Sequence, residues 1–119
     1  MPELEDRGDY FGATWDTAYG DVDISVDRPD YNAEARGLLA NIASDVDSLI
    51  AVSLAYFESV KQQRSIAYID DLSDPHIVCS QSDFSIYWSS AAGERNGDGT
   101  IAIDFDGRTR TPVGLTLAD

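Results

Sequence analysis

The chain has 119 residues, of which 22 are acidic and eight are basic, so its formal net charge is −14 and its pI is near 4.1. A field of this sign repels nucleic acids and anionic membranes, and it attracts cations and basic proteins. Binding to DNA, RNA or a membrane is therefore disfavoured. The length fits one domain, residues 1–119, with a core large enough to fold without disulfides or metals.

The composition predicts a folded protein without a membrane span or a secretion signal. No apolar run approaches the ~20 residues that a membrane span needs. Residues 1–9 are acidic and contain neither the basic nor the apolar region of a signal peptide. The one cysteine, Cys79, has no partner for an internal disulfide, which agrees with a reducing compartment. We therefore expect a cytoplasmic protein.

The first third of the chain predicts a loose end followed by a hairpin. Residues 1–9 combine proline, glycine and acids, and we expect them to be flexible. A first strand is expected over residues 10–15. In the second, over residues 21–27, Val22, Ile24 and Val26 alternate with polar residues, most of them acidic. The pattern puts the aliphatic side chains in a core and an acidic row on the other side.

Residues 32–64 form the only long stretch with a helical period. One straight helix of this length would measure about 50 Å, which exceeds the width of a compact domain of this size. Ser44 and the acid three residues later, Asp47, suggest a new helix start. We therefore expect a helix near 32–42, capped by Asp30 or Asn32, then a break, then a helix over about 46–63.

The rest of the chain has the period of strands. We expect strands over residues 76–79, 83–89, 100–106 and 108–117, with a glycine-rich connection at 90–98 and a tight turn at 106–107. The predicted fold class is α+β. An N-terminal hairpin and a C-terminal meander are expected to form one antiparallel twisted sheet of five or six strands. One long, broken helical segment is expected to pack on one face of this sheet.

No residue pattern indicates catalysis. His76 and Cys79 are three apart on a predicted strand, so alternation puts them on opposite faces, beyond hydrogen-bond reach. We expect a buried thiol and an exposed loop histidine. Residues 94–99 match part of a calcium-binding loop, but the twelfth position holds Phe105 instead of glutamate, and a polar hairpin loop explains them equally. We predict no enzyme activity, no catalytic residue, no metal and no cofactor.

The predicted site is an acidic surface on the sheet. Its members are the outward-facing residues Asp21, Asp23, Asp27, Tyr87, Asp104 and Asp106. Carboxylates steer the encounter with a basic protein, and an aromatic ring supplies buried area. The sequence leaves open whether the two acidic rows adjoin. It also leaves open that the face is merely solvated.

Three stretches carry a resemblance to known proteins. They are TWDTAYGDVDISV (14–26), LLANIASDVDSLIAVSLAYFESV (38–60) and DFSIYWSSAAGERNGDGTIAIDFDG (83–107). Their order resembles small acidic bacterial domains of unknown function that are associated with toxin-immunity systems. The resemblance implies a hairpin, a helical segment and a C-terminal antiparallel meander. It carries over no individual functional residue.

Size, charge and this resemblance together predict a non-catalytic immunity protein or inhibitor that occludes a basic partner such as a bacterial toxin. Two alternatives remain. One is an acidic mimic of nucleic acid that inhibits a DNA-binding complex. The other is a structural domain of a salt-adapted host, in which acidity serves solubility alone.

Overall fold

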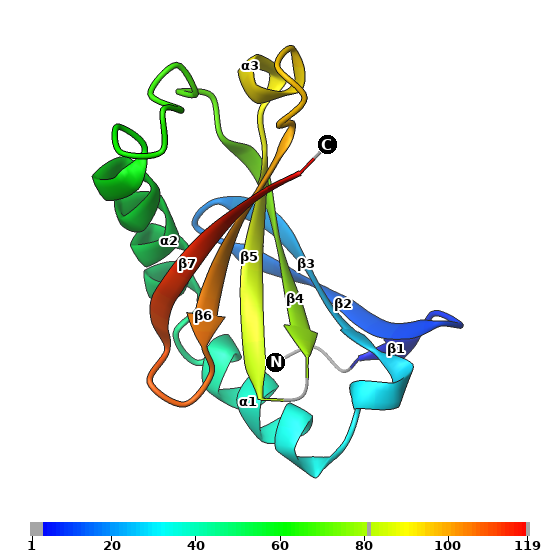
Figure 1. The fold of residues 1–119 in the computed structure, drawn as a ribbon. Coiled ribbons are helices and arrows are strands. Elements are labelled where there is room, and N and C mark those ends of the chain that lie inside the picture. Colours follow the sequence, from blue (N-terminus) through cyan, green and yellow to red (C-terminus); the bar gives the residue numbers. More distant parts are fainter. Residues whose placement is uncertain (1–3, 81, 119) are drawn as a thin grey trace.

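In the computed structural model, which describes residues 4–80 and 82–118, seven strands form one sheet in the order β1-β2-β3-β4-β5-β6-β7 (Figure 1). The strands are β1 (Glu5–Asp6), β2 (Tyr10–Thr17), β3 (Gly20–Asp27), β4 (Ser73–Ser80), β5 (Asp83–Ser89), β6 (Thr100–Asp106) and β7 (Thr111–Ala118). The helices are α1 (Ala33–Ala43), α2 (Val46–Val60) and the one-turn α3 (Ala91–Glu94), and a 3₁₀ turn, Arg28–Asp30, follows β3.

Neighbouring strands are antiparallel except β3 and β4, which run parallel with Asp23 opposite His76. A parallel pair needs a crossover connection, because a tight turn reverses the chain direction. Helices α1 and α2 supply this crossover and lie against one face of the sheet (Figure 1). The predicted α+β class is therefore confirmed, but the sheet is only mostly antiparallel, because β3 and β4 form a parallel pair where an antiparallel sheet was predicted.

The predicted number of strands is wrong. The sheet has seven strands instead of five or six, because Glu5–Asp6 pairs with Gly12 and Phe11 of β2. A two-residue strand leaves no alternation to detect. This strand falls within residues 1–9, which were expected to be a loose end, and residues 1–3 of that end lie outside the described residues. The one long, broken helical segment of the prediction consists of two separate helices, α1 and α2, which are divided at the predicted break.

The helix boundaries follow local hydrogen bonding. The Asn32 Oδ1 atom accepts a hydrogen bond from the Ala35 backbone N–H at 2.9 Å, so Asn32 caps α1, and not Asp30, the other residue that the sequence offered for this role. The break before residue 46 is also confirmed, but the predicted capping pattern there does not form. The Asp47 carboxylate instead accepts the backbone N–H of Ala18, at the tip of the β2–β3 hairpin.

The chain bends by 83° between α1 and α2. No single helix among the described residues is long and apolar enough to span a membrane, and α1 and α2 reach that length and composition only as a pair.

The core lies between the helices and one face of the sheet. The helices contribute Ala35, Leu38, Leu39, Ile42, Leu49, Ile50 and Phe57, at the spacings that place them on one side. Alternate residues of the strands face them, including Trp15, Ile24, Ile77, Ile86, Trp88 and Ile103. The opposite face of strands β2–β6 is covered by neither α1 nor α2, and we call it the open face (Figure 1).

Candidate functional site

A row of four residues crosses the centre of the open face. Register places Thr14, Asp23, His76 and Tyr87 side by side on the consecutive strands β2, β3, β4 and β5. The Thr14 hydroxyl donates a 2.6 Å hydrogen bond to the Asp23 carboxylate. The His76 ring packs edge-on against Tyr87, with 5.0 Å between the ring centroids. These contacts join the row in two pairs, Thr14 with Asp23 and His76 with Tyr87.

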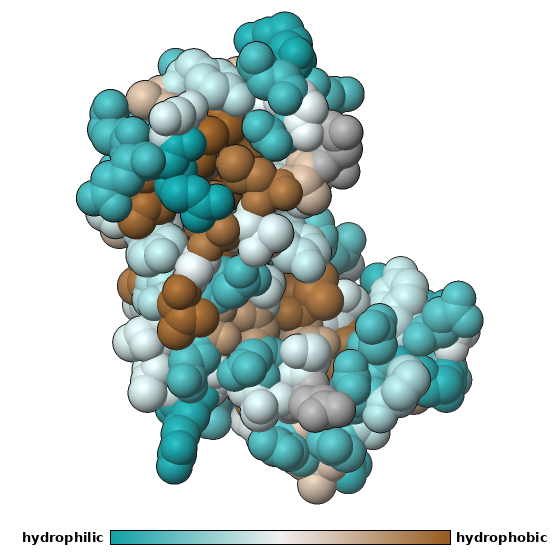
Figure 2. Space-filling model, in the orientation of Figure 1, coloured by the Kyte–Doolittle hydropathy of each residue, from teal (hydrophilic) through white to brown (hydrophobic). Residues whose placement is uncertain are grey.

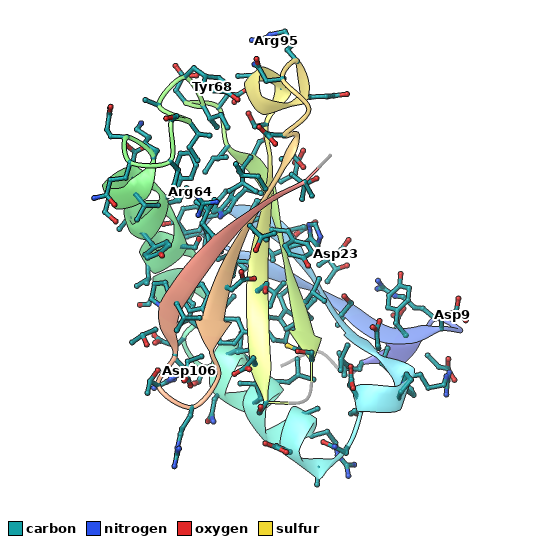
Figure 3. The ribbon with its side chains drawn as sticks, in the orientation of Figure 1. Asp9, Asp23, Arg64, Tyr68, Arg95 and Asp106 are labelled. Atoms are coloured by element: carbon teal, nitrogen blue, oxygen red, sulfur yellow. The ribbon has the colours of Figure 1, made fainter. Side chains whose placement is uncertain are left out.

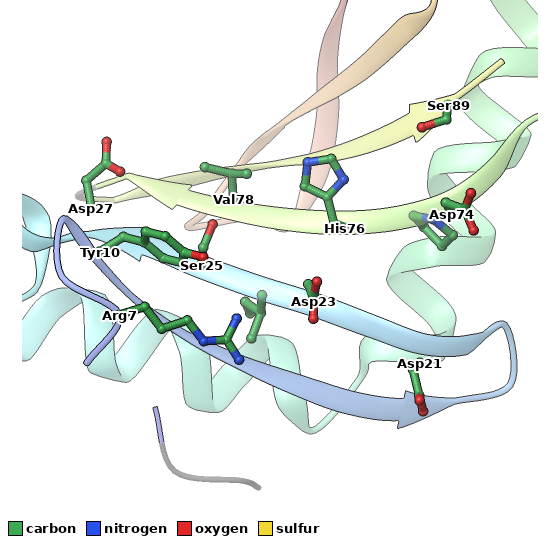
Figure 4. Close-up of a pocket in the computed structure, with 12 residues that line it drawn as sticks. Arg7, Tyr10, Asp21, Asp23, Ser25, Asp27, Asp74, His76, Val78 and Ser89 are labelled. Carbon is green, nitrogen blue, oxygen red and sulfur yellow. The ribbon is translucent and has the colours of Figure 1, made fainter. Parts of the chain in front are cut away.

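A hollow of about 670 Å³ opens beside this row, over β2–β5 (Figure 4). Four carboxylates line it, from Asp21, Asp23, Asp27 and Asp74, together with Arg7, Tyr10 and His76. In Figure 2 the part of the surface formed by β1–β3 is coloured mostly as hydrophilic. The three aspartates of β3 are exposed, and none of them takes part in the ion pairs found within the described part of the chain. The hollow is therefore accessible and anionic.

A fifth carboxylate extends this surface and, like Asp74, was absent from the predicted site. Asp16 lies directly opposite Asp21 in the β2–β3 hairpin, and both side chains are exposed. Like charges directly opposite each other destabilise a strand pair. Asp16 was missed because the first strand was expected to end at Trp15, whereas β2 continues to Thr17.

The acids of β6 share the open face with those of β3 but do not adjoin them. Strands β4 and β5 lie between, which puts the two rows about 14 Å apart. Figure 3 accordingly labels Asp23 and Asp106 in separate regions. The sequence left this point open, and the register decides it: the rows form two separate acidic strips.

The two carboxylates of β6 are also engaged within the fold. Asp104 is half-buried and accepts hydrogen bonds from the hydroxyls of Ser85 at 2.7 Å and Thr116 at 2.9 Å. Asp106 accepts the backbone N–H groups of Arg108 and Thr109, which lower its pKa. The β6 carboxylates thus hold strands and a turn together, whereas those of β3 are more exposed.

Comparison with models of known families, with curated proteins and with solved structures finds no match for this chain. The geometry of the open face therefore carries the functional argument.

The position of His76 differs from the sequence prediction. It lies half-buried in β4 on the open face, whereas an exposed loop position was expected. Burial lowers the pKa of His76, and the nearby Asp23 carboxylate acts in the opposite direction. The neutral imidazole therefore leaves the negative charge of the hollow in place near neutral pH.

The predicted separation of the histidine from the cysteine is confirmed. Cys79 points into the core, and burial raises the pKa of its thiol to about 12. A protonated thiol on the far side of the sheet cannot act with His76 as a nucleophile–base pair.

The calcium alternative gains no support from the 94–99 segment. The Asn96 side-chain amide donates to the Ala92 carbonyl, so it helps to close the turn after α3. Among residues 4–80 and 82–118, no group of three or more His, Cys, Asp and Glu side chains is placed to hold a metal ion.

Proposed function

We propose that this protein is a non-catalytic binding domain whose open face covers a basic surface of another protein. The observation that carries the proposal is the line of exposed carboxylates at Asp21, Asp23 and Asp27, which form no ion pair with any described residue, on a sheet face that α1 and α2 leave free. These carboxylates accelerate encounter with a basic partner, and the rings of Tyr10 and Tyr87 supply contact area beside them.

The specific form that we propose is an inhibitor or immunity protein that occludes the cationic site of a basic partner such as a bacterial toxin. Blocking a site requires a stable complex and no covalent chemistry. The pairs Thr14–Asp23 and His76–Tyr87 suit this role, because groups that already contact each other before binding lose less freedom in the complex.

The nucleic-acid mimic is less well supported. It calls for a broad ridge of acids that imitates the charge of a phosphate backbone. The β3 carboxylates form one row, and the β6 carboxylates are bonded inside the protein. Competition between duplex DNA and this protein for the same partner would favour the mimic.

Calorimetric titration of the protein with a hexa-arginine peptide at low salt tests the binding proposal. Asp21→Asn/Asp23→Asn/Asp27→Asn is expected to weaken binding at least tenfold. The control Glu34→Gln/Asp70→Asn/Glu94→Gln makes the same change in net charge at exposed positions outside the hollow. It should weaken binding much less, because distant charges are screened. Equal losses in the two variants would contradict a binding function of the open face.

The inhibitor form is tested by expressing the protein together with a toxin encoded beside its gene. The wild type and the control variant should restore growth of the host, and the variant of the three β3 aspartates should not. Rescue that survives the loss of all three carboxylates would exclude occlusion by this face.

A further inference from the structure

The cationic side chain of Arg7 lies over the open face. The turn between β1 and β2 is closed by the Arg7 backbone N–H, which donates to the Tyr10 carbonyl at 2.9 Å. From this turn the Arg7 side chain extends across β2 and lines the hollow (Figure 4). A Cβ added at Gly12 would lie 3.0 Å from its Nη1 atom, so the missing side chain of Gly12 provides the space for the guanidinium. Only 28% of the Arg7 side chain is exposed.

Weak contacts hold this guanidinium. Its one ion pair among the described residues is with Glu5, at 3.7 Å, and the Glu5 side chain is 74% exposed. Such surface pairs contribute little to stability. The segment is otherwise anchored by the two-residue strand β1, by Leu4, which is partly buried against the core, and by Arg28, which bonds Asp6 and the Gly8 carbonyl at the surface. Segments with so few buried contacts open at low cost.

We propose that Arg7 shields the hollow and that a cationic side chain of the partner binds by displacing it. The proposal rests on the proposed function of the open face. In the free protein the guanidinium lines the same hollow as the β3 carboxylates and so offsets part of the negative charge there. A partner's arginine or lysine competes for the same space, so the N-terminal turn reduces the affinity of the face for weakly basic proteins.

The test is a titration with hexa-arginine of Arg7→Gln and of a matched control, Arg95→Gln. Both variants raise the net negative charge by one, but Arg95 lies beyond α3, away from the hollow (Figure 3). Arg7→Gln is expected to bind the peptide several-fold more tightly than Arg95→Gln. Equal or weaker binding by Arg7→Gln would overturn the proposal.

A second variant moves Arg7 without removing its charge. In Gly12→Ala the new methyl group meets the Arg7 guanidinium and the Tyr10 ring, both of which are mobile ends of side chains. It should therefore displace Arg7 and also bind more tightly than the wild type. Binding by Gly12→Ala no tighter than that of the wild type would likewise contradict the shield.

These outcomes separate the two proposals. If the wild type binds the peptide through the β3 aspartates but Arg7→Gln behaves like Arg95→Gln, the shield alone is refuted. If no variant binds the peptide, both proposals fail.

Discussion

At the scale of single residues, Ser53 is a polar group placed inside the core. Its hydroxyl accepts a 3.0 Å hydrogen bond from the Trp88 indole N–H and donates to the Ile50 carbonyl at 2.7 Å. The bond links α2 to β5 behind the row that crosses the open face. The indole N–H of Trp15, by contrast, is buried without a hydrogen-bond partner.

Replacing Ser53 by alanine should lower the free energy of unfolding by about 1–2 kcal/mol, because it leaves the buried indole N–H of Trp88 unsatisfied. Ser59→Ala is the matched control, since Ser59 lies on the same helix and donates to the Tyr56 carbonyl at an exposed position. Its effect should stay within about 0.5 kcal/mol. Urea unfolding measures both, and equal effects would contradict the assigned hydrogen bond.

The carboxylates of Asp16 and Asp21 lie opposite each other, so we expect them to lower stability while they favour binding of a basic partner. Asp16→Asn should raise the free energy of unfolding by about 0.2–1 kcal/mol, because it removes a like-charge pair. The same change should weaken binding of hexa-arginine. Asp70→Asn, at an exposed loop position, should change neither quantity to a comparable extent. Tighter binding by Asp16→Asn would show that the pair is not part of the binding surface.

His76 predicts the pH dependence of stability in mild acid. Its pKa in the folded protein lies below the ordinary value of 6.5, so in this window the unfolded chain binds the proton and the folded chain does not. Stability should therefore fall as the pH drops below about 6.5, and His76→Gln should remove that part of the slope. The lowered pKa values of Asp6, Asp71 and Asp106 act below the ordinary 3.8 instead. An unchanged slope in His76→Gln would contradict the assignment.

At the scale of the elements, the two glycines Gly37 and Gly107 occupy opposite environments. Gly37 lies within α1, with nothing within 4 Å of an added Cβ. Gly107 follows β6, where an added Cβ would overlap the carbonyl oxygen of Ser82. At Gly37 the glycine therefore only costs backbone entropy, whereas at Gly107 the fold requires a residue without a side chain.

Gly37→Ala should therefore stabilise the protein by about 0.5–1 kcal/mol, because alanine loses less backbone freedom in a helix. Gly107→Ala should destabilise it, because backbone must move. Thermal unfolding of both variants provides the measurement. A destabilised Gly37→Ala would mean that α1 packs against something at this position.

Local periodicity predicted most of the helices and strands, because the alternation of a strand and the apolar stripe of a helix depend only on residues close together in the sequence. The break between α1 and α2 was predictable from length, and the cap at Asn32 from residue type. The parallel pairing of β3 with β4 was not, since register between distant strands is decided by packing of the crossover helices. The same pairing brings His76 beside Asp23, so the central part of the site could not be read from the sequence.

At the scale of the whole molecule, the chain carries a net charge of −14. Its acidic residues lie on the open face, at the start of helices and in turns. Self-repulsion of this charge opposes folding, and salt screens it. The free energy of unfolding in urea should therefore rise between low salt and about 1 M NaCl, where the Debye length is about 3 Å. No change with salt would contradict this account of the charge. The solubility alternative predicts the same rise, so stability alone does not separate it from binding.

The central claim is that the open face, with its β3 carboxylates, is the binding surface. An NMR titration of the isotopically labelled protein with hexa-arginine at low salt tests it most directly. The account predicts chemical-shift changes concentrated at the amides of β2–β5 around Thr14, Asp23 and His76, with α1 and α2 unaffected. Shift changes spread over all acidic surfaces, or centred on the helices, would contradict it.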